Sequence, residues 1–296
     1  MFSLSPMPLI RLGNLFPRCE VYAKCEFLAP SGCFKIRGAV HLLEYLSREG
    51  RVRQLIVPSM GNTALGAAVG AKAFGFSMVG VVPQTISQTK DEKLKALGVE
   101  LIKIAGGGSD LLLRATEIAN ERGGYFVHPH LDPLWTDGYQ SIAAEILHAL
   151  PGCRSLVFPV GGGGLLMGLL AHQRKNPAPV RMFGCEPYNY PKYAEFHHAR
   201  SITIADGLLL EKPHPSVQQA IADSNVTISM VAEADIRMAL HDLVETQALI
   251  VEPSSAITLA FVKAHAGELE EPICVVLTGA NIAHDSGGTR RPSPAH

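Results

Sequence analysis

The sequence lacks several features that mark particular classes of protein. Only 18% of its 296 residues are charged and the formal net charge is −1, so there is no electrostatic footprint for nucleic acid or an anionic membrane. No apolar run approaches the roughly 20 residues that a membrane-spanning helix needs. The first residues have neither the basic region nor the apolar core of a signal peptide, so we expect a cytoplasmic protein.

Cysteine is also sparse, and its spacing is uninformative. No Cys-x-x-Cys pair occurs among the six cysteines, which are Cys19, Cys25, Cys33, Cys153, Cys185 and Cys274. We therefore expect reduced thiols, with neither a zinc site nor a disulfide framework. His128 and His130 are interpreted as loop or core residues because no third ligand stands at metal spacing, and Trp135 as a packing residue.

Apolar residues, in contrast, are plentiful. They make up 47% of the chain, enough for one large or two modest domains. Short, wholly apolar runs at 55–57 and 156–160 alternate with segments of helical spacing such as 63–74 and 164–172. Strands that are apolar throughout and alternate with helices predict an α/β fold with parallel sheets covered on both faces.

The most informative stretch is Pro-Ser-Gly-Cys-Phe-Lys-Ile-Arg-Gly-Ala at residues 30–39. Pro30 and Gly32 indicate a turn, and the apolar spacing that follows predicts a helix that begins near Lys35. The positive end of the helix dipole and partial burial both disfavour an ammonium there. Lys35 could therefore become a neutral amine that forms a Schiff base, although a solvated lysine on a helix is the simpler interpretation of this stretch alone.

Two further stretches connect a strand to a helix, where backbone amides can bind an anion. Residues 58–63 (Pro-Ser-Met-Gly-Asn-Thr) add the side-chain amide of Asn62, although turn formation alone also explains this sequence. Residues 160–165 (Val-Gly-Gly-Gly-Gly-Leu) allow successive amides to converge on a phosphate. They match neither Gly-x-Gly-x-x-Gly nor a Walker motif, which argues against dinucleotides and triphosphates.

A fourth stretch, residues 275–281 (Val-Val-Leu-Thr-Gly-Ala-Asn), completes a resemblance. Together the four stretches resemble the threonine dehydratase and serine racemase family, pyridoxal-phosphate (PLP) enzymes of fold type II, the fold of the tryptophan synthase β-subunit. Residues 34–39 match the family's Schiff-base motif, with Cys33 where the family usually has serine. The resemblance covers roughly residues 8–281.

The resemblance implies two domains, each a three-layer αβα unit with a parallel-rich sheet, and PLP at their interface. Residues 1–53 and 133–285 would form the large PLP-binding domain, and residues 54–132 a small mobile domain. We expect the tail, residues 286–296, to be disordered because it is rich in Gly, Pro, Ser and Arg. A homodimer is expected from the family alone.

The resemblance also implies roles for individual residues. Lys35 would be the catalytic residue, and the cofactor would be held by Phe34, Lys35, Asn62, Gly161, Gly162, Gly163, Gly164, Leu165 and Thr278. The substrate carboxylate would be held by Ser59, Met60, Gly61, Asn62 and Thr63. The segments of this chain that contain Glu186 and Asp206 resemble segments of the family. In some relatives, acidic groups near these segments hold a divalent cation, but we expect no metal here.

Two departures from the family bear on the reaction. Met60 stands where racemases have a serine that moves a proton, and a thioether cannot do so, which counts against racemisation. Thr63 stands where dehydratases usually have histidine and cysteine synthases have threonine. Thr278, in contrast, matches the family, which has serine or threonine beside the pyridine nitrogen. Its neutral hydroxyl leaves the ring a weaker electron sink than a carboxylate partner would, which suits elimination.

We therefore predict a PLP-dependent lyase that dehydrates and deaminates a small L-hydroxy amino acid such as serine or threonine. The product would be a 2-oxo acid with ammonia. The alternatives are a β-replacement synthase of the cysteine synthase kind, then an epimerase, then a PLP-binding protein without catalysis. A Rossmann dehydrogenase is a poor fit because both the fingerprint and the acidic ribose partner are missing.

Overall fold

The strands of the protein form two separate sheets in the computed structural model, which describes residues 2–59, 61–194, 202–209 and 212–282. A six-stranded sheet has the order β1-β2-β10-β7-β8-β9. Its strands are β1 (Leu9–Arg11), β2 (Val21–Cys25), β7 (Ser155–Pro159), β8 (Arg181–Pro187), β9 (Val226–Val231) and β10 (Ile273–Leu277). Apart from the antiparallel β1–β2 pair, neighbouring strands are parallel.

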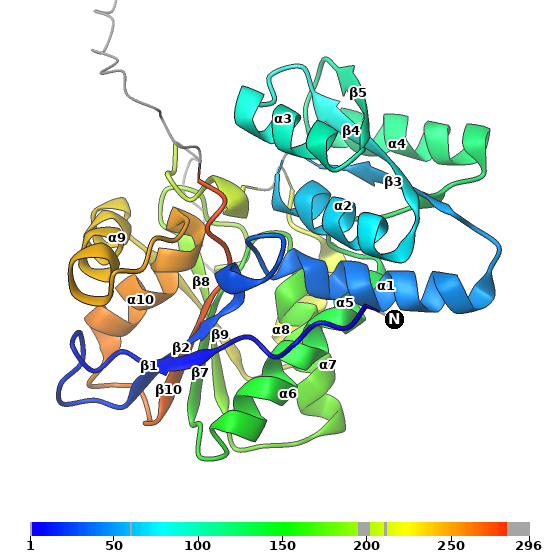
Figure 1. The fold of residues 1–296 in the computed structure, drawn as a ribbon. Helices are drawn as coiled ribbons and strands as arrows, with labels where there is room; N and C mark the ends of the chain where they lie inside the picture. Colours follow the sequence, from blue (N-terminus) through cyan, green and yellow to red (C-terminus); the bar gives the residue numbers. More distant parts are fainter. Residues whose placement is uncertain (1, 60, 195–201, 210–211, 283–296) are drawn as a thin grey trace, which may run out of the picture.

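The second sheet has four parallel strands in the order β5-β4-β3-β6. They are β3 (Gln54–Pro58), β4 (Ser77–Pro83), β5 (Glu100–Ile104) and β6 (Tyr125–Phe126). All four come from one continuous part of the chain, whereas the strands of the larger sheet come from both sides of it. The two sheets occupy opposite ends of the molecule in Figure 1.

Helices cover both faces of each sheet, as expected for wholly apolar parallel strands (Figure 1). The larger sheet packs on one face against α9 (Glu233–Gln247) and α10 (Pro253–His265), and on the other against α6 (Gln140–Ala149) and α7 (Gly164–Lys175). The smaller sheet packs against α4 (Gly108–Arg122) on one face. Its other face packs against α2 (Asn62–Phe74) and α3 (Gln88–Ala96).

Helix α1 (Lys35–Glu49) lies between the two halves and packs along α2 (Figure 1). The two helices approach closely at Gly66, where a Cβ atom would lie 2.8 Å from the Lys35 backbone. A side chain at Gly66 would therefore push α2 away from the start of α1. The remaining helices are α5 (Pro133–Thr136) and α8 (Pro215–Ala222), with short 3₁₀ turns at Glu26–Leu28, Asp137–Tyr139 and Asp206–Leu208.

The predicted fold class is confirmed: the protein is α/β, with two parallel-rich sheets in three-layer arrangements. The helix expected near Lys35 begins at that residue, and all six cysteines are free. The exact division into a large and a small mobile domain stays a prediction, and the tail at 286–296 lies outside the described residues. Within the described residues, no helix has the length and apolarity to cross a membrane.

Candidate active site

Lys35 occupies the first position of α1, at the positive end of the helix dipole. Its ammonium nitrogen lies 4.9 Å from the ring centre of Phe34 and 5.8 Å from that of Tyr139. Among the described residues, no carboxylate forms an ion pair with Lys35. Burial without an acidic partner lowers the pKa of Lys35 to about 8, so a useful fraction of the amine is neutral near physiological pH.

The turn before Lys35 is fastened to the end of β10. The Phe34 amide donates to the Thr278 carbonyl at 2.9 Å, and the Ala280 amide donates to the Gly32 carbonyl at 3.0 Å. Buried Thr278 directs its hydroxyl to Ser255, with 3.1 Å between the oxygens. The structure thus brings the first and fourth predicted stretches together across more than 240 residues of sequence.

The loop between β3 and α2 carries the second predicted stretch, and we call residues 59–63 the asparagine loop. The Ser59 hydroxyl accepts the amides of Gly61 at 3.1 Å and Ala64 at 3.2 Å, which holds the loop in shape. The amides of Asn62 and Thr63 have no acceptor among the described residues. Free amides at a helix start suit a carboxylate ligand. Met60 lies outside the described residues.

The Asn62 side chain joins this loop to the larger half of the protein. Its nitrogen donates to both carboxylate oxygens of Glu252, at 3.0 and 2.8 Å, and its oxygen accepts from Asn281 at 2.9 Å. The backbone N–H of Asn281 donates to the Glu252 carboxylate at 2.7 Å. Burial raises the pKa of Glu252, and the Asn62 hydrogen bonds oppose this rise. We call these three residues the Asn62–Glu252–Asn281 clasp.

The turn between β7 and α7 carries the third stretch, and we call residues 161–164 the glycine loop. Among the described residues, the amides of 161–165 have no acceptor, so five donors are available at the start of one helix. A Cβ atom on Gly162 would lie 2.2 Å from the imidazole of His130, so glycine is required there. Such a row of amides is suited to a phosphate.

Tyr139 connects the glycine loop to Lys35, a role that the sequence did not reveal. Its buried ring lies 4.8 Å from that of Phe34, and a Cβ atom on Gly164 would lie 3.5 Å from it. Trp135 is buried, as predicted, and its indole nitrogen donates to the Tyr139 hydroxyl at 2.5 Å. The aromatic spacing alone could not distinguish Tyr139 from an ordinary core residue.

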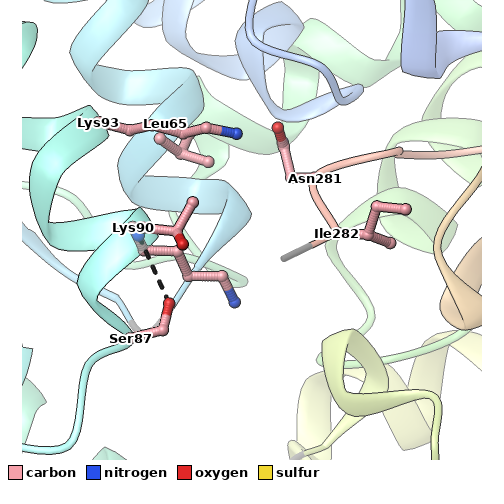
Figure 2. Close-up of a pocket in the computed structure, with 7 residues that line it drawn as sticks. Leu65, Ser87, Lys90, Lys93, Asn281 and Ile282 are labelled. Atoms are coloured by element: carbon pink, nitrogen blue, oxygen red, sulfur yellow. Dashed lines mark hydrogen bonds between the residues drawn. The ribbon is translucent and has the colours of Figure 1, made fainter. Parts of the chain in front are cut away.

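A small cavity opens beside the asparagine loop, between α3 and the segment after β10 (Figure 2). Lys90 and Lys93 line it from α3, and Asn281 lines it from the opposite side. The Lys90 ammonium lies 3.6 Å from the position that a Cβ atom on Gly61 would take. This side of the asparagine loop therefore carries positive charge, which favours an anionic ligand.

Glu186, one of the acidic groups noted in the sequence, is fully buried beside a buried lysine. The Lys192 ammonium lies 3.1 Å from its carboxylate, which also accepts the amides of Lys192, Tyr193 and Ala194. The lysine thus balances the charge of Glu186. Within the described part of the chain, no three His, Cys, Asp or Glu side chains converge in a way that could hold a metal ion.

The geometry fits PLP. The cofactor has an aldehyde, which a neutral lysine amine can attack, and a phosphate, which the five free amides can bind. It also has a pyridine nitrogen, for which the buried hydroxyl of Thr278 is a suitable partner. Lys35 and Phe34, the glycine loop with Leu165, Thr278 and Asn62 are the residues that would hold it, which remains a prediction for each residue.

Comparison with known proteins shows the family of the chain. The family model for pyridoxal-phosphate dependent enzymes matches residues 2–279. An L-threonine ammonia-lyase of Geobacter sulfurreducens is 31% identical over 270 residues, which cover 88% of this chain and 67% of that protein. An L-threonine ammonia-lyase of Thermotoga maritima is 32% identical over 271 residues, 89% of this chain and 67% of its own length.

Solved structures show the same fold. The processed form of threonine deaminase isoform 2 from Solanum lycopersicum superposes with a TM-score of 0.87 at 26% identity, covering 95% of this chain and 81% of that one. Maize serine racemase superposes with a TM-score of 0.86 at 24% identity, covering 95% and 90%, and shows likeness of fold alone. The chain therefore belongs to the pyridoxal-phosphate dependent enzyme family.

Proposed function

We propose that this protein is a PLP-dependent ammonia-lyase that converts a small L-hydroxy amino acid, such as serine or threonine, to a 2-oxo acid and ammonia. The observation that carries the proposal is Lys35, a buried lysine with a lowered pKa, in a protein with two strand-to-helix loops whose backbone amides have no acceptor among the described residues. The names of the relatives, L-threonine ammonia-lyases and a threonine deaminase, support this substrate class.

The residues divide the work of the reaction. PLP, when bound, supplies an electron sink that makes the α-proton of the amino acid acidic. The asparagine loop would bind the substrate carboxylate through the amides of Asn62 and Thr63, which orients the α-carbon. The neutral Lys35 amine would remove the α-proton, since its pKa of about 8 suits a base that works near neutral pH.

The leaving hydroxyl needs a proton as it departs. The glycine loop would hold the cofactor phosphate through its backbone amides, and the bound phosphate would supply an acidic group for that proton. A buried site favours elimination over side reactions because it keeps water away from the reacting atoms. Phe34 and Tyr139, which flank the Lys35 amine, contribute to that exclusion.

A β-replacement synthase is the second candidate. It is favoured by the Asn62-Thr63 pair, since cysteine synthases, which the chain also resembles here, have threonine at that position. In that case a thiol or an amine would add at the β-carbon after the leaving group departs. Elimination and replacement share the first proton transfer, so only the fate of the substrate distinguishes them.

The test is a substrate assay of the PLP-loaded protein. L-serine, L-threonine and their O-acetyl and O-phospho esters are supplied in turn, and 2-oxo acid and ammonia are measured. Oxo acid from the free hydroxy amino acids is the expected result. Turnover of the esters alone, and only when a thiol or an amine is added, would instead establish β-replacement.

We further propose that the protein acts in the cytoplasm as a homodimer and that residues 54–132 move as a small domain relative to 1–53 and 133–285. Six free cysteines support a reducing compartment. The continuous origin of the four-stranded sheet supports the division of the chain. Light scattering coupled to size exclusion measures the oligomeric state, and a monomer at micromolar concentration would contradict the proposed homodimer.

A further inference from the structure

Three histidines gather beside the glycine loop, outside the set of residues assigned above. The ring centres of His130 and His214 are 5.8 Å apart, those of His128 and His214 are 5.7 Å apart, and those of His128 and His130 are 6.2 Å apart. They come from two separate segments, the turn after β6 and the residue that precedes α8. Protonation of more than one of them is disfavoured because like charges at this separation repel one another.

His130 occupies the central position in this cluster. The Cγ, Nδ1 and Cδ2 atoms of its ring lie 2.2, 2.3 and 2.5 Å from the position that a Cβ atom on Gly162 would take. No hydrogen bond joins the imidazole to another residue that the structure describes. The Lys35 ammonium is close enough to depress the pKa of His130, after burial, which has the larger effect. His130 therefore contacts the glycine loop at Gly162 and is within electrostatic range of Lys35.

Among the described residues, no acidic group shifts the pKa of these three histidines. Burial lowers the pKa of each of the three imidazoles, and the only other groups that contribute are Lys35 and the histidines themselves. The Nε2 atom of His214 is buried and has no hydrogen-bond partner within the described chain. A buried polar nitrogen without a partner is costly, and an anionic ligand would supply what the protein does not.

We propose that His130 is a cofactor-binding residue, whose imidazole N–H donates a hydrogen bond to an anionic oxygen of PLP. PLP has two such oxygens, those of its phosphate and its phenolate, and both belong to a molecule held between Lys35 and the glycine loop. The inference rests on the proposed cofactor site, and it assigns to His130 more than the loop or core role that its sequence context indicates.

The test measures cofactor affinity rather than turnover. PLP and pyridoxal, which lacks the phosphate, are titrated against the wild-type protein and the variants His130→Phe and His130→Asn. Phenylalanine keeps the ring without a donor, and asparagine keeps an N–H donor. His148→Phe, at an exposed position of α6, serves as the matched control. Thermal unfolding of each variant separates loss of binding from loss of the fold.

We expect His130→Phe to weaken PLP binding about 10- to 100-fold, the loss that follows when one hydrogen bond to a charged group is removed. His130→Asn should keep most of the affinity, and His148→Phe all of it. A loss confined to PLP would place the contact at the phosphate. An equal loss with pyridoxal would place it at the phenolate oxygen.

Unchanged PLP affinity in His130→Phe would overturn the proposal, as would equal losses in the phenylalanine and asparagine variants, which would assign the effect to packing. If the folded wild-type protein fails to bind PLP, the proposed function itself is wrong. The two failures are therefore distinguishable, because only the second appears in the wild type.

Discussion

The asparagine loop and the glycine loop solve a similar problem in different ways. Each follows a buried parallel strand, β3 or β7, and each presents, at the start of a helix, amides that have no acceptor in the described part of the chain. The glycine loop uses the backbone alone and needs residues without side chains, as the contact of Gly162 with His130 shows. The asparagine loop uses side chains: Ser59 shapes it and Asn62 fastens it to Glu252.

The difference would suit the two ligands proposed for these loops, the cofactor phosphate and the substrate carboxylate. A phosphate that stays bound through many turnovers is held well by a rigid cradle of backbone donors. A substrate that must enter and leave each time requires a loop whose contacts can be made and broken. We therefore expect substitutions in the glycine loop to affect cofactor binding, and those in the asparagine loop to affect substrate use.

The largest effect should come from Lys35, which is proposed both to bind the cofactor and to act on the substrate. Lys35→Ala is expected to lower turnover by at least about 10³-fold, because it removes both the nucleophile for the cofactor and the base for the α-proton. Turnover of the purified variant with added PLP is the measurement. Lys72→Ala, an exposed lysine of α2, is the control. An active Lys35→Ala protein would refute the mechanism.

The second effect concerns pH. Only the neutral amine of Lys35 can attack the cofactor aldehyde, and burial lowers its pKa to about 8. The rate of PLP loading should therefore rise about 50-fold from pH 6 to pH 8 and level off above about pH 9. Stopped-flow absorbance follows the reaction. A rate that continues to rise towards pH 10 would show an ordinary, solvated lysine.

Gly162→Ala tests the glycine loop. Its Cβ atom would collide with the His130 ring, and overpacking of this kind costs about 2 kcal/mol, which corresponds to roughly 30-fold in PLP affinity. Equilibrium titration with PLP is the measurement. Gly152→Ala is the matched control because nothing lies within 4 Å of its new Cβ atom. Equal PLP affinities in Gly162→Ala and Gly152→Ala would contradict the proposal that the glycine loop binds the cofactor.

Asn62→Ala tests the clasp of the asparagine loop. The loss of two hydrogen bonds to the buried Glu252 carboxylate should lower kcat/KM about 10-fold or more, with a smaller change in PLP affinity. A double-mutant cycle with Glu252→Gln measures the coupling between the two side chains. Additive effects would mean that the contact does not matter for catalysis.

The smallest effect is expected at Ser59. Ser59→Ala leaves the amides of Gly61 and Ala64 without their acceptor, a loss of about 1 kcal/mol that should raise KM for the amino acid about 5-fold. Steady-state kinetics detects this change, and Ser59→Thr, which keeps the hydroxyl, should restore the value. A larger loss of PLP affinity than of substrate affinity would contradict the division between the two loops.

Much of this site could be predicted from short stretches of sequence. Lys35 and the two loops are each contained in a few consecutive residues, and turn chemistry places them where strands end and helices begin. The parallel arrangement of the sheets also follows from apolar strands that alternate with helices. Short sequence patterns are therefore sufficient to predict those parts of the site that lie within a few consecutive residues.

Contacts between distant residues could not be predicted in this way. Asn62 and Glu252 are separated by 190 positions, and nothing in either segment names the other as its partner. Tyr139 and His130 resemble ordinary core and loop residues until the fold places one against Phe34 and the other against Gly162. Pairings of this kind depend on tertiary packing, which no local pattern encodes.

The clasp of Asn62, Glu252 and Asn281 has a consequence for timing. It joins the start of α2, the helix that follows β3 of the smaller sheet, to segments next to strands and helices of the larger half, so any separation of the two at this point must break its hydrogen bonds. If these bonds contribute about 3 kcal/mol together, roughly one molecule in 150 is open there at equilibrium. The population of this open state, together with the chemistry at Lys35, would then affect how fast product leaves.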